Sequence, residues 1–591
     1  MCRLRCRAVL LFLLLAACAP EAPAASLRFV SLQPSGTAGE WTAVVAGRLP
    51  REPVFRADST TLTADAEPLG KDQVRFRLKG VPVGVSRIEI GEAKGKRTAA
   101  FSASAAVRVG PVDPARDPWA DWTIYHVMME MFANGNPGND GEITGWKHPN
   151  YAGGDLQGLL QRAGYLQDLG VNAVWLSPVF AAKTSHGYDV RNYYRIGDAI
   201  GVPGDPNASL ELFRQVVRDL HGRGIQVILD LPLNHASASY ERDASGDPDH
   251  LDPKSTTARQ EAEKIWDSWG AGFRYWNFDH EPTRRFLKNA ALYWLTREDV
   301  DGLRLDYARG VPHDFWAELS AEVRKAKPGA YLVGEVWMDA QGPEGNAREI
   351  AAYYEKVEGQ PQLDSLLEFP LQAVATSVFA KGGPATDLED MLQETEALYG
   401  PDALPSHFLD NHDMARFLAW TPQTERLVAA VGFLASLTGP DILFYGTETG
   451  LTHGGPKTGF TDVGRIPMPW NGLNQPLLRQ VQEILKARRT HPALGRGGRL
   501  PLLADKDALV FAKVSPGETV LVGVNLGGSP RALDLDLSGL LPKGTRLEPV
   551  AGGTAAAETS AETGRLQWTL PPLATSIAAA PRDPAFPSPG R

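Results

Sequence analysis

The chain has 591 residues, of which 43% are hydrophobic and 22% are charged, a composition typical of a globular protein with a large buried core. This length exceeds that of one ordinary domain and predicts roughly three. The formal net charge is −10, and no basic patch or basic helical stripe offsets it, which argues against a nucleic-acid partner.

Residues 1–17 have the pattern of an export signal. Three arginines precede an apolar run at 8–17, which is too short to span a membrane stably. The run ends in "LAAC", which resembles the bacterial lipoprotein signal, in which the cysteine becomes the lipidated first residue. Cys18 is therefore the expected lipidation site, and an ordinary cleaved signal peptide is the alternative.

The residue after Cys18 bears on where the exported protein is held. Ala19 is not the aspartate that often retains lipoproteins at the inner membrane, so we expect a lipid anchor in the outer membrane if the cell has one. Membrane contact is expected through this anchor only. No cysteine follows Cys18, so we expect no internal disulfide, thiolate metal cluster or cysteine nucleophile in the mature chain.

Short alternating runs predict a β-sandwich domain at each end of the mature chain. Residues 18–112 begin with a flexible tether and continue with runs such as "WTAVVAGRL" and "QVRFRLKG". A carbohydrate-binding module and a plain spacer are both consistent with this N-terminal sandwich. Residues 497–591 return to such runs, for example "ALVFAKV" and "ETVLVGVNL", which predict a C-terminal sandwich followed by a tail.

Residues 113–496 alternate strand-like and helix-like runs. Most of the expected strands are followed by helical periodicity, for instance "LELFRQVVRDLHGRG". Eight such units predict an α/β fold, the (β/α)8 TIM barrel. Residues 236–280, rich in Asp, Ser and Gly, are expected to form an inserted loop domain after the third strand. The expected strands are 123–130, 171–178, 225–232, 302–306, 330–337, 363–370, 406–413 and 441–448.

Four of these strands end in acids, amides or imidazoles. In a TIM barrel, functional side chains lie at the C-terminal ends of the strands. A single Asp after a strand is usually a helix N-cap, but capping does not explain four strands that deliver such groups to one rim. The side chains are Asp230, Asn234, His235, Asp306, Glu335, Asn411, His412 and Asp413.

The segments that carry these groups resemble the signature regions of the α-amylase family, glycoside hydrolase family thirteen. The four regions appear in order as "DLPLNH", "GLRLDYARG", "GEVW" and "FLDNHD". The stretches "GVNAVWLSPVF", "SHGYDVRNYY" and "PDILFYGTETG" match as well. The resemblance covers residues 120–495 and implies a TIM-barrel glycosidase.

The resemblance also implies catalytic roles. Asp306 would be the nucleophile, and Arg304, two residues earlier on the same face of the strand, would hydrogen-bond it. Glu335 would act first as general acid and then as general base. Asp413 would stabilise the oxocarbenium-like transition state. A nucleophile must be charged while the acid is protonated at the same pH, so their environments must differ.

Further residues are expected to bind the sugar. The resemblance implies that His235 and His412 hydrogen-bond sugar hydroxyls and that Tyr188 stacks on the sugar at the cleavage point. Arg309, one helical turn beyond the nucleophile, is expected to reach the sugar on the leaving-group side. Gly310 adds no side chain and is expected to leave room beside it for a polymer.

Two loops, "FANGNPGND" and "YAGGDLQG", are rich in oxygen atoms. Asparagine and aspartate oxygens at such close spacing suit a hard cation. The arrangement resembles a calcium site near the first barrel strand in cyclodextrin glucanotransferases and related amylases; an Asn/Gly turn without an ion is the alternative. The predicted calcium ligands are Asn134, Asn136, Asn139, Asp140, Gly153 and Asp155.

The sequence departs from common family patterns in two places. The chain has "MEMF" where the family often has "DRF", so an acid–arginine pair is absent there. After the nucleophile it has Arg309 and Gly310 where many amylases have Lys-His. These differences bear on packing and on leaving-group contacts.

The motifs favour an exported, retaining hydrolase of α-1,4-glucosidic bonds in starch-like glucans and maltooligosaccharides. A cyclomaltodextrinase, a neopullulanase-like enzyme or an α-glucan transglycosylase is the alternative, because the same residues serve each of them. A glycan-binding protein without catalysis is disfavoured, because all three catalytic carboxylates are present.

Overall fold

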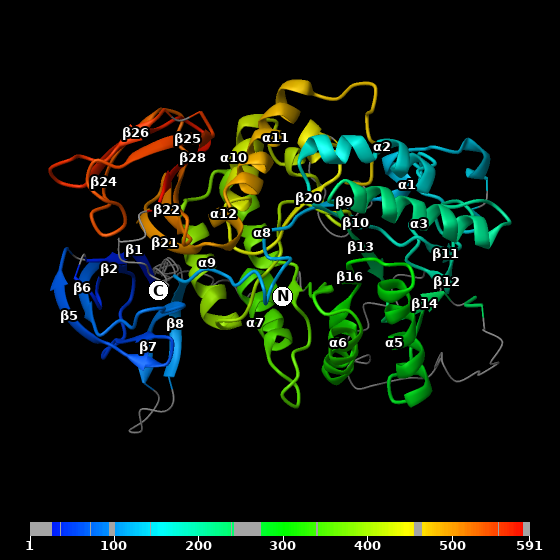
Figure 1. Cartoon of the computed structure of the whole chain (residues 1–591), viewed down its shortest axis with the longest axis horizontal. Helices are drawn as coiled ribbons and strands as arrows, with labels where there is room; N and C mark the ends of the chain where they lie inside the picture. Colours follow the sequence, from blue (N-terminus) through cyan, green and yellow to red (C-terminus); the bar gives the residue numbers. More distant parts are fainter. Residues whose placement is uncertain are drawn as a thin grey trace, which may run out of the picture.

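The computed structural model describes residues 27–582, apart from 36, 71, 94–100, 142, 238, 242–272, 338–340, 454–463 and 554. The predicted signal segment and Cys18 lie outside the described residues. Among those described, no helix is long and apolar enough to cross a membrane. A parallel-stranded barrel and two sets of antiparallel strands lie on opposite sides of the molecule (Figure 1).

The barrel consists of eight parallel strands in the order β18-β17-β16-β13-β10-β9-β20-β19. A parallel bridge between Leu367 and Ser406 joins the two ends of this sheet and closes the ring. Every strand falls within a segment that the sequence predicted, so the TIM barrel is confirmed. The strands are β9 (Thr123–Val127), β10 (Ala173–Leu176), β13 (Gln226–Leu231), β16 (Gly302–Leu305), β17 (Tyr331–Gly334), β18 (Ser365–Leu366), β19 (His407–Phe408) and β20 (Asp441–Phe444).

Helices surround the barrel, and local sequence explains where they begin. In α3 (Pro206–Gly222), the Asp205 side chain accepts the Ala208 N–H, and Pro206 occupies the first turn, where its missing N–H costs nothing. The buried face of α3 consists of Ser209, Phe213, Val216, Val217 and Leu220. The other α-helices in the described part of the chain are α1 (Met129–Phe132), α2 (Leu156–Leu169), α5 (Glu281–Thr296), α6 (His313–Ala326), α7 (Gly342–Tyr354), α8 (Phe369–Ala375), α9 (Thr386–Tyr399), α10 (Thr424–Leu434), α11 (Gln475–Thr490) and α12 (Ala493–Arg496).

Large side chains fill the barrel at the N-terminal ends of its strands. Tyr331, the first residue of β17, is fully buried, and the rings of Trp119 and Trp122 contact it at 4.9 and 5.6 Å. These tryptophans lie just before β9, the first strand of the barrel. These large rings close the N-terminal end of the barrel.

The predicted insertion after the third strand is described only at its two ends. There, β14 (His235–Ser237) pairs antiparallel with β15 (Phe273–Tyr275). The intervening residues 242–272 lie outside the described part. A second excursion, β11 (Phe180–Ala182) with β12 (Val190–Ile196), brackets the loop that carries Tyr188.

The chain ends form antiparallel sheets, as the sequence predicted. The N-terminal part has sheets β1-β2-β6-β5 and β4-β3-β7-β8, and the C-terminal part has β21-β22-β23-β28-β25-β26 and β24-β27. The strands are β1 (Arg28–Pro34), β2 (Glu40–Ala46), β3 (Val54–Ala57), β4 (Thr60–Thr61), β5 (Thr63–Pro68), β6 (Gln73–Lys79), β7 (Arg87–Ala93), β8 (Phe101–Arg108), β21 (Gly498–Ala504), β22 (Ala508–Val514), β23 (Glu518–Asn525), β24 (Arg531–Asp536), β25 (Arg546–Ala551), β26 (Ala557–Glu558), β27 (Arg565–Leu570) and β28 (Ala574–Pro581).

The two terminal parts share one hydrophobic core. Phe29 and Leu32 of β1 belong to the same buried cluster as Leu500 of β21 and Val510 of β22. In Figure 1 the blue N-terminal strands and the orange-red C-terminal strands lie side by side. The two sandwiches are therefore packed against each other as well as against the barrel.

Candidate active site

Arg304 lies at the centre of a group of carboxylates from three neighbouring strands. It is fully buried on β16. Its Nη1 donates to Oδ1 of Asp230 at 2.8 Å and to Oδ1 of Asp306 at 2.7 Å. Its Nη2 lies 2.9 Å from Oε2 of Glu335. One guanidinium therefore holds the predicted nucleophile and the predicted general acid together.

Asp230, on β13, supports this arginine from inside the barrel. Its Oδ2 accepts hydrogen bonds from Nε1 of Trp175 and from the Tyr188 hydroxyl, both at 2.9 Å. Asp230 has no exposed surface. Asp230 offers no surface for a substrate contact, and its hydrogen bonds orient Arg304.

The surroundings of Glu335 favour its protonated form. Burial raises the pKa of its carboxyl to about 8; Arg304 opposes this, and Asp306 and Asp413 add to it. Its Oε2 accepts the N–H of Tyr307 at 2.9 Å. Tyr307 has φ 41°, in the left-handed region, which turns the backbone sharply at the end of the strand. A carboxyl that is neutral at neutral pH suits a general acid.

Asp413 is held by an arginine from a distant loop. Nη2 of Arg465 donates to Oδ1 of Asp413 at 2.9 Å, and Nε of Arg465 donates to the carbonyl of His412 at 3.1 Å. Burial raises the pKa of Asp413, and the charges of Arg465 and Arg304 oppose this rise. The arginine thus favours the charged form of Asp413 at the rim.

The predicted sugar-binding residues gather beside these carboxylates. The Tyr188 ring stacks on His412 at 5.3 Å and 3°, and its hydroxyl lies 2.8 Å from Nε2 of His412. His235 lies next to them, with Nε2 at 3.1 Å from the carbonyl oxygen of Tyr188. Burial lowers the pKa of both histidines. Neutral imidazoles suit hydrogen bonds to uncharged hydroxyl groups.

Of the two expectations for the segment after the predicted nucleophile, the structure leaves one open and contradicts the other. Nε of Arg309 donates to Oε1 of Glu349 on α7 at 3.2 Å; its contact with a leaving-group sugar stays a prediction. The prediction that Gly310 leaves room for a polymer is wrong. A Cβ there would come within 2.4 Å of Nδ2 of Asn234 and 2.5 Å of the Tyr307 ring. Glycine is needed at this position for close packing.

The two loops predicted to bind calcium lie against each other. Nδ2 of Asn134 donates to Oδ1 and Oδ2 of Asp140 at 3.1 and 3.0 Å. Gly153 has φ 69°, and a Cβ there would lie 2.3 Å from Nδ2 of Asn134 and 2.4 Å from Oδ1 of Asp140. The glycine backbone therefore approaches both side chains closely. The structure brings these three predicted ligands together.

Asp155 and Asn136 make hydrogen bonds that hold the loops. Oδ1 of Asp155 accepts the N–H groups of Gly135 and Gly158 at 3.1 and 2.6 Å. Its Oδ2 accepts from the Asn136 N–H at 2.8 Å and from Nδ2 of Asn139 at 3.3 Å. Asp155 is the N-cap of α2. Its contacts favour a capping role over the ligand role that the sequence predicted.

The remaining oxygens partly fit a hard cation. Oδ1 of Asn139 is buried and accepts no hydrogen bond, as expected for an oxygen aimed at an ion. Oδ1 of Asn136 accepts the N–H of Gly138 at 3.1 Å. In the described part of the chain, no three His, Cys, Asp or Glu side chains group together as a metal site. Any site here depends on amide and carbonyl oxygens with Asp140.

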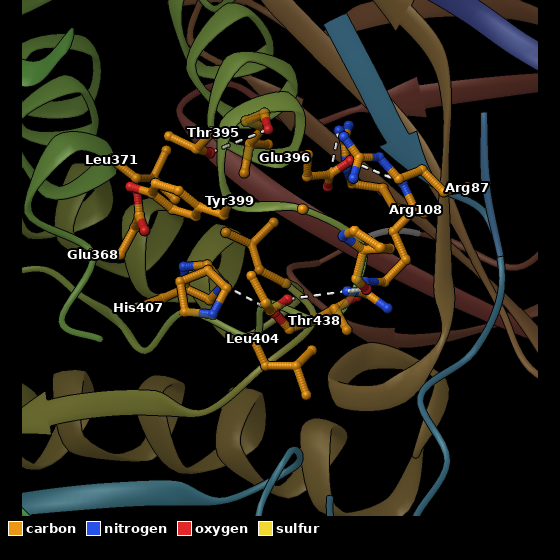
Figure 2. A pocket seen from close by; sticks show the side chains of 17 residues that line it. Arg87, Arg108, Glu368, Leu371, Thr395, Glu396, Tyr399, Leu404, His407 and Thr438 are labelled. Atoms are coloured by element: carbon orange, nitrogen blue, oxygen red, sulfur yellow. Dashed lines mark hydrogen bonds and ion pairs between the residues drawn. The ribbon is translucent and has the colours of Figure 1, made fainter. Parts of the chain in front are cut away.

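A small enclosed pocket of about 50 Å³ lies away from the carboxylates. Arg87 and Arg108 of the N-terminal strands line one side, and Tyr399, Glu368 and His407 line the other (Figure 2). None of the predicted catalytic residues lines it. The pocket belongs to the junction between the barrel and the terminal domains.

The family model for the α-amylase catalytic domain matches residues 126–267 and 271–486, more than half of the chain. This chain belongs to the α-amylase family. The resemblance inferred from the four sequence regions is thereby confirmed, and the protein is a glycoside hydrolase of the α-amylase type.

Several relatives of this α-amylase-family enzyme have known activities or structures. It is 30% identical over 433 residues to a cyclomaltodextrinase of Geobacillus thermopakistaniensis, with 69% of each chain covered. It is 31% identical over 435 residues to neopullulanase 2 of Thermoactinomyces vulgaris, again with 69% of each chain covered. A solved α-amylase of Geobacillus thermoleovorans, crystallised with acarbose, is 25% identical, with a TM-score of 0.66 over 79% of this chain and 99% of that one.

Sequence reasoning about this α-amylase-family enzyme missed several supporting residues. Nothing in the sequence near Arg465 indicated that it meets Asp413. Trp175 and His126 sat in strands predicted as core, yet their rings stack at 3.6 Å and 3° directly behind Asp230. The tryptophan at position 175 was the one signal in the sequence that could have indicated this contact, because a buried indole N–H needs a hydrogen-bond acceptor.

Proposed function

We propose that this enzyme is a retaining hydrolase of α-1,4-glucosidic bonds in starch-like glucans and maltooligosaccharides. The observation that carries the proposal is the guanidinium of Arg304, which contacts Asp306 with one arm and Glu335 with the other. Carboxylates held this way suit the separation of about 5–5.5 Å in retaining enzymes, rather than the roughly 6.5–9.5 Å of inverting enzymes.

The proposed reaction has two displacements. Asp306 attacks the anomeric carbon while the protonated Glu335 gives its proton to the departing glycosidic oxygen. The resulting Glu335 carboxylate then takes a proton from water, which attacks the glycosyl-enzyme ester and releases Asp306. Asp413 stabilises the positive charge that develops on the sugar in both steps. Tyr188, stacked beside His412, provides the apolar face on which that sugar rests.

A cyclomaltodextrinase or neopullulanase-like specificity is the second candidate. It is favoured by the relatives at 30% and 31% identity, which are named for those activities. The α-glucan class of substrate has support from solved relatives named as complexes with acarbose and with maltose. An α-glucan transglycosylase would use the same carboxylates with a sugar in place of water as the acceptor.

Product analysis with soluble starch, maltoheptaose, β-cyclodextrin and pullulan separates these candidates. We expect starch and linear maltooligosaccharides to give short maltooligosaccharides, with the α-anomer appearing first in proton NMR spectra. Faster cleavage of cyclodextrin or pullulan than of starch would favour the second candidate. An initial β-anomer would exclude Asp306 as a nucleophile.

We further propose that the enzyme is exported and lipid-anchored at Cys18, in the outer membrane of a cell that has one. The support is the "LAAC" motif. Firm anchoring needs more than one acyl chain, because one alone binds a membrane weakly. The wild type should partition with membranes and the Cys18→Ala variant with the soluble fraction. A wild type found wholly in the soluble fraction would contradict the proposal.

We also propose a calcium ion at the loops around Asp140. Asn134, Asn139 and the carbonyl of Gly153 would complete its ligand set, with the Asn134 amide turned so that its oxygen faces the ion. The support is the buried, unpartnered Oδ1 of Asn139 and the close approach of Gly153 to Asp140. The ion would stabilise the loops and take no part in bond cleavage.

A further inference from the structure

Trp146 is a large aromatic side chain exposed to solvent near the active site. It is 44% exposed; within the described part of the chain, the other exposed large hydrophobic residues are Leu69, Val83 and Leu398. An isolated exposed apolar side chain needs no explanation. The loop that carries Trp146, however, is held beside the loop that leads to Tyr188.

Backbone hydrogen bonds tie the Trp146 loop to the loop that leads to Tyr188. The N–H of Gly145 donates to the carbonyl of Lys183 at 2.8 Å, and the N–H of Ser185 donates to the carbonyl of Trp146 at 3.1 Å. A Cβ at Gly145 would lie 2.7 Å from the Lys183 carbonyl oxygen. Only glycine allows this approach, so the backbone that carries the indole has a defined position.

A continuous series of rings connects this indole to the catalytic centre. The Trp146 ring lies 5.8 Å from that of His186, and the His186 ring lies 5.7 Å from that of Tyr188. The Tyr188 hydroxyl in turn donates to Asp230 behind Arg304. A chain of sugars leaving the cleavage point over His186 would therefore meet the exposed indole.

His186 supplies a polar group between the two aromatic rings. Its Nδ1 accepts the N–H of Tyr188 at 3.1 Å, which leaves Nε2 as the protonated nitrogen of a neutral ring. A glucose ring has an apolar C–H face and a rim of hydroxyl groups. A flat indole can bury the C–H face, while an imidazole N–H can donate a hydrogen bond to a hydroxyl group.

We propose that Trp146 is a sugar-binding platform that sets the preference of this enzyme for longer α-glucan chains. Its indole face binds a glucose unit of a chain that extends beyond the unit held at Tyr188. The inference rests on the proposed α-glucan hydrolase function and adds a specificity-determining residue to it. Binding energy gained at this distance from the bond that breaks can be used to accelerate cleavage.

Lys147, the residue after Trp146, ties this loop to its surroundings. Nζ of Lys147 donates to the carbonyl of Asp140 at 3.1 Å and lies 4.2 Å from the centre of the Tyr151 ring. The platform is thus braced against the proposed calcium loop. A loop backbone that is already held in place loses little conformational entropy when the loop binds a sugar.

Sugar binding to inactive enzyme tests this proposal directly. In a Glu335→Gln background, maltoheptaose and maltose would be titrated by calorimetry with and without Trp146→Ala. We expect the substitution to raise the Kd for maltoheptaose about tenfold and the Kd for maltose much less. Trp146→Tyr should recover most of the affinity. Leu398→Ala, which removes an exposed apolar side chain on α9, should change neither Kd.

Turnover by otherwise wild-type enzyme distinguishes failure of the inference from failure of the proposed function. Suppose that the wild type hydrolyses maltoheptaose, but the Kd for maltoheptaose is the same with and without the Trp146→Ala substitution. That result would overturn the platform proposal and leave the proposed function standing. A wild type that leaves maltoheptaose intact would overturn both. A change of oligomeric state on Trp146→Ala, with unchanged sugar binding, would assign the indole to a subunit interface and overturn the platform.

Discussion

Glu335 depends on burial for its proposed chemistry. Since its pKa is raised to about 8, the acid form dominates at neutral pH and is lost as the pH rises through that value. The apparent pKa belongs to a set of interacting carboxyls and not to Glu335 alone. We therefore expect kcat/KM to fall on the alkaline side with an apparent pKa near 8.

Glu335→Gln should remove the alkaline fall of kcat/KM together with most of the activity. Loss of a general acid is expected to lower kcat on maltoheptaose by about 10²–10⁴-fold. The loss should be smaller on an aryl glycoside whose leaving group needs no proton. Glu483→Gln, an exposed change on α11, is the control. An unchanged alkaline limb in the Gln variant would assign the acid to another residue.

Arg465 governs the charge of Asp413. Removing the arginine should let the pKa of Asp413 rise further, so its charged form would be lost at a higher pH. For Arg465→Ala we expect the acidic limb of the kcat/KM profile to move upward. The maximum should fall about 10- to 100-fold, because a hydrogen bond to a charged group contributes about 1.5–3 kcal/mol.

A surface arginine provides the control for Arg465. Arg324 pairs with Asp364 at 2.8 Å on the outside of the barrel, and Arg324→Ala should leave the pH profile unchanged. An Arg465→Ala enzyme with the wild-type acidic limb would show that this arginine has only a structural role.

At the scale of elements, the loop before α2 combines a helix cap with the proposed ion site. Asp155→Ala should lower the free energy of unfolding by about 1–2 kcal/mol, with or without calcium, because an N-cap is lost. Asp140→Ala should instead abolish the response to chelator. Thermal melts in EDTA and in Ca²⁺ would measure both effects. A wild-type melt that EDTA leaves unchanged would exclude the ion.

The strands of the barrel were well predicted because each is a short apolar run bounded by turn residues. Their C-terminal ends share one rim in any parallel barrel, so Asp306, Glu335 and Asp413 could be grouped before the structure was known. The role of Asp155 could not be fixed from the sequence, because a side chain that caps a helix and one that binds an ion occupy the same kind of oxygen-rich loop.

At the scale of the whole molecule, α9 fastens the N-terminal domain to the barrel. Oε1 of Gln393 accepts the N–H of Phe29 at 2.7 Å, and its Nε2 donates to the Phe29 carbonyl at 2.8 Å. Nearby, Nη1 of Arg499 pairs with Glu389 at 2.7 Å in a fully buried contact. These contacts tie both terminal domains to one helix.

Gln393→Ala should therefore lower the free energy of unfolding of the barrel and the terminal domains together. It leaves the buried backbone groups of Phe29 without partners, at a cost of about 1–3 kcal/mol. We expect a lower denaturation midpoint with a single transition, because the terminal domains share a core. Gln482→Ala, which removes an exposed bond to Asp168, should have little effect. Separate transitions for the terminal domains and the barrel would contradict this expectation.

The sequence by itself determined the order of strands and the rim that carries the three carboxylates predicted to be catalytic. The strands and the rim follow from local patterns and from the rule that parallel strands end at one edge, whereas the roles of the carboxylates were implied by the resemblance to the α-amylase family. Only the tertiary structure decided that Arg465 meets Asp413, that Gly310 is packed against Asn234 and that the terminal domains share a core. Those contacts join residues far apart in the chain, and their formation depends on loop paths that leave no periodic signal.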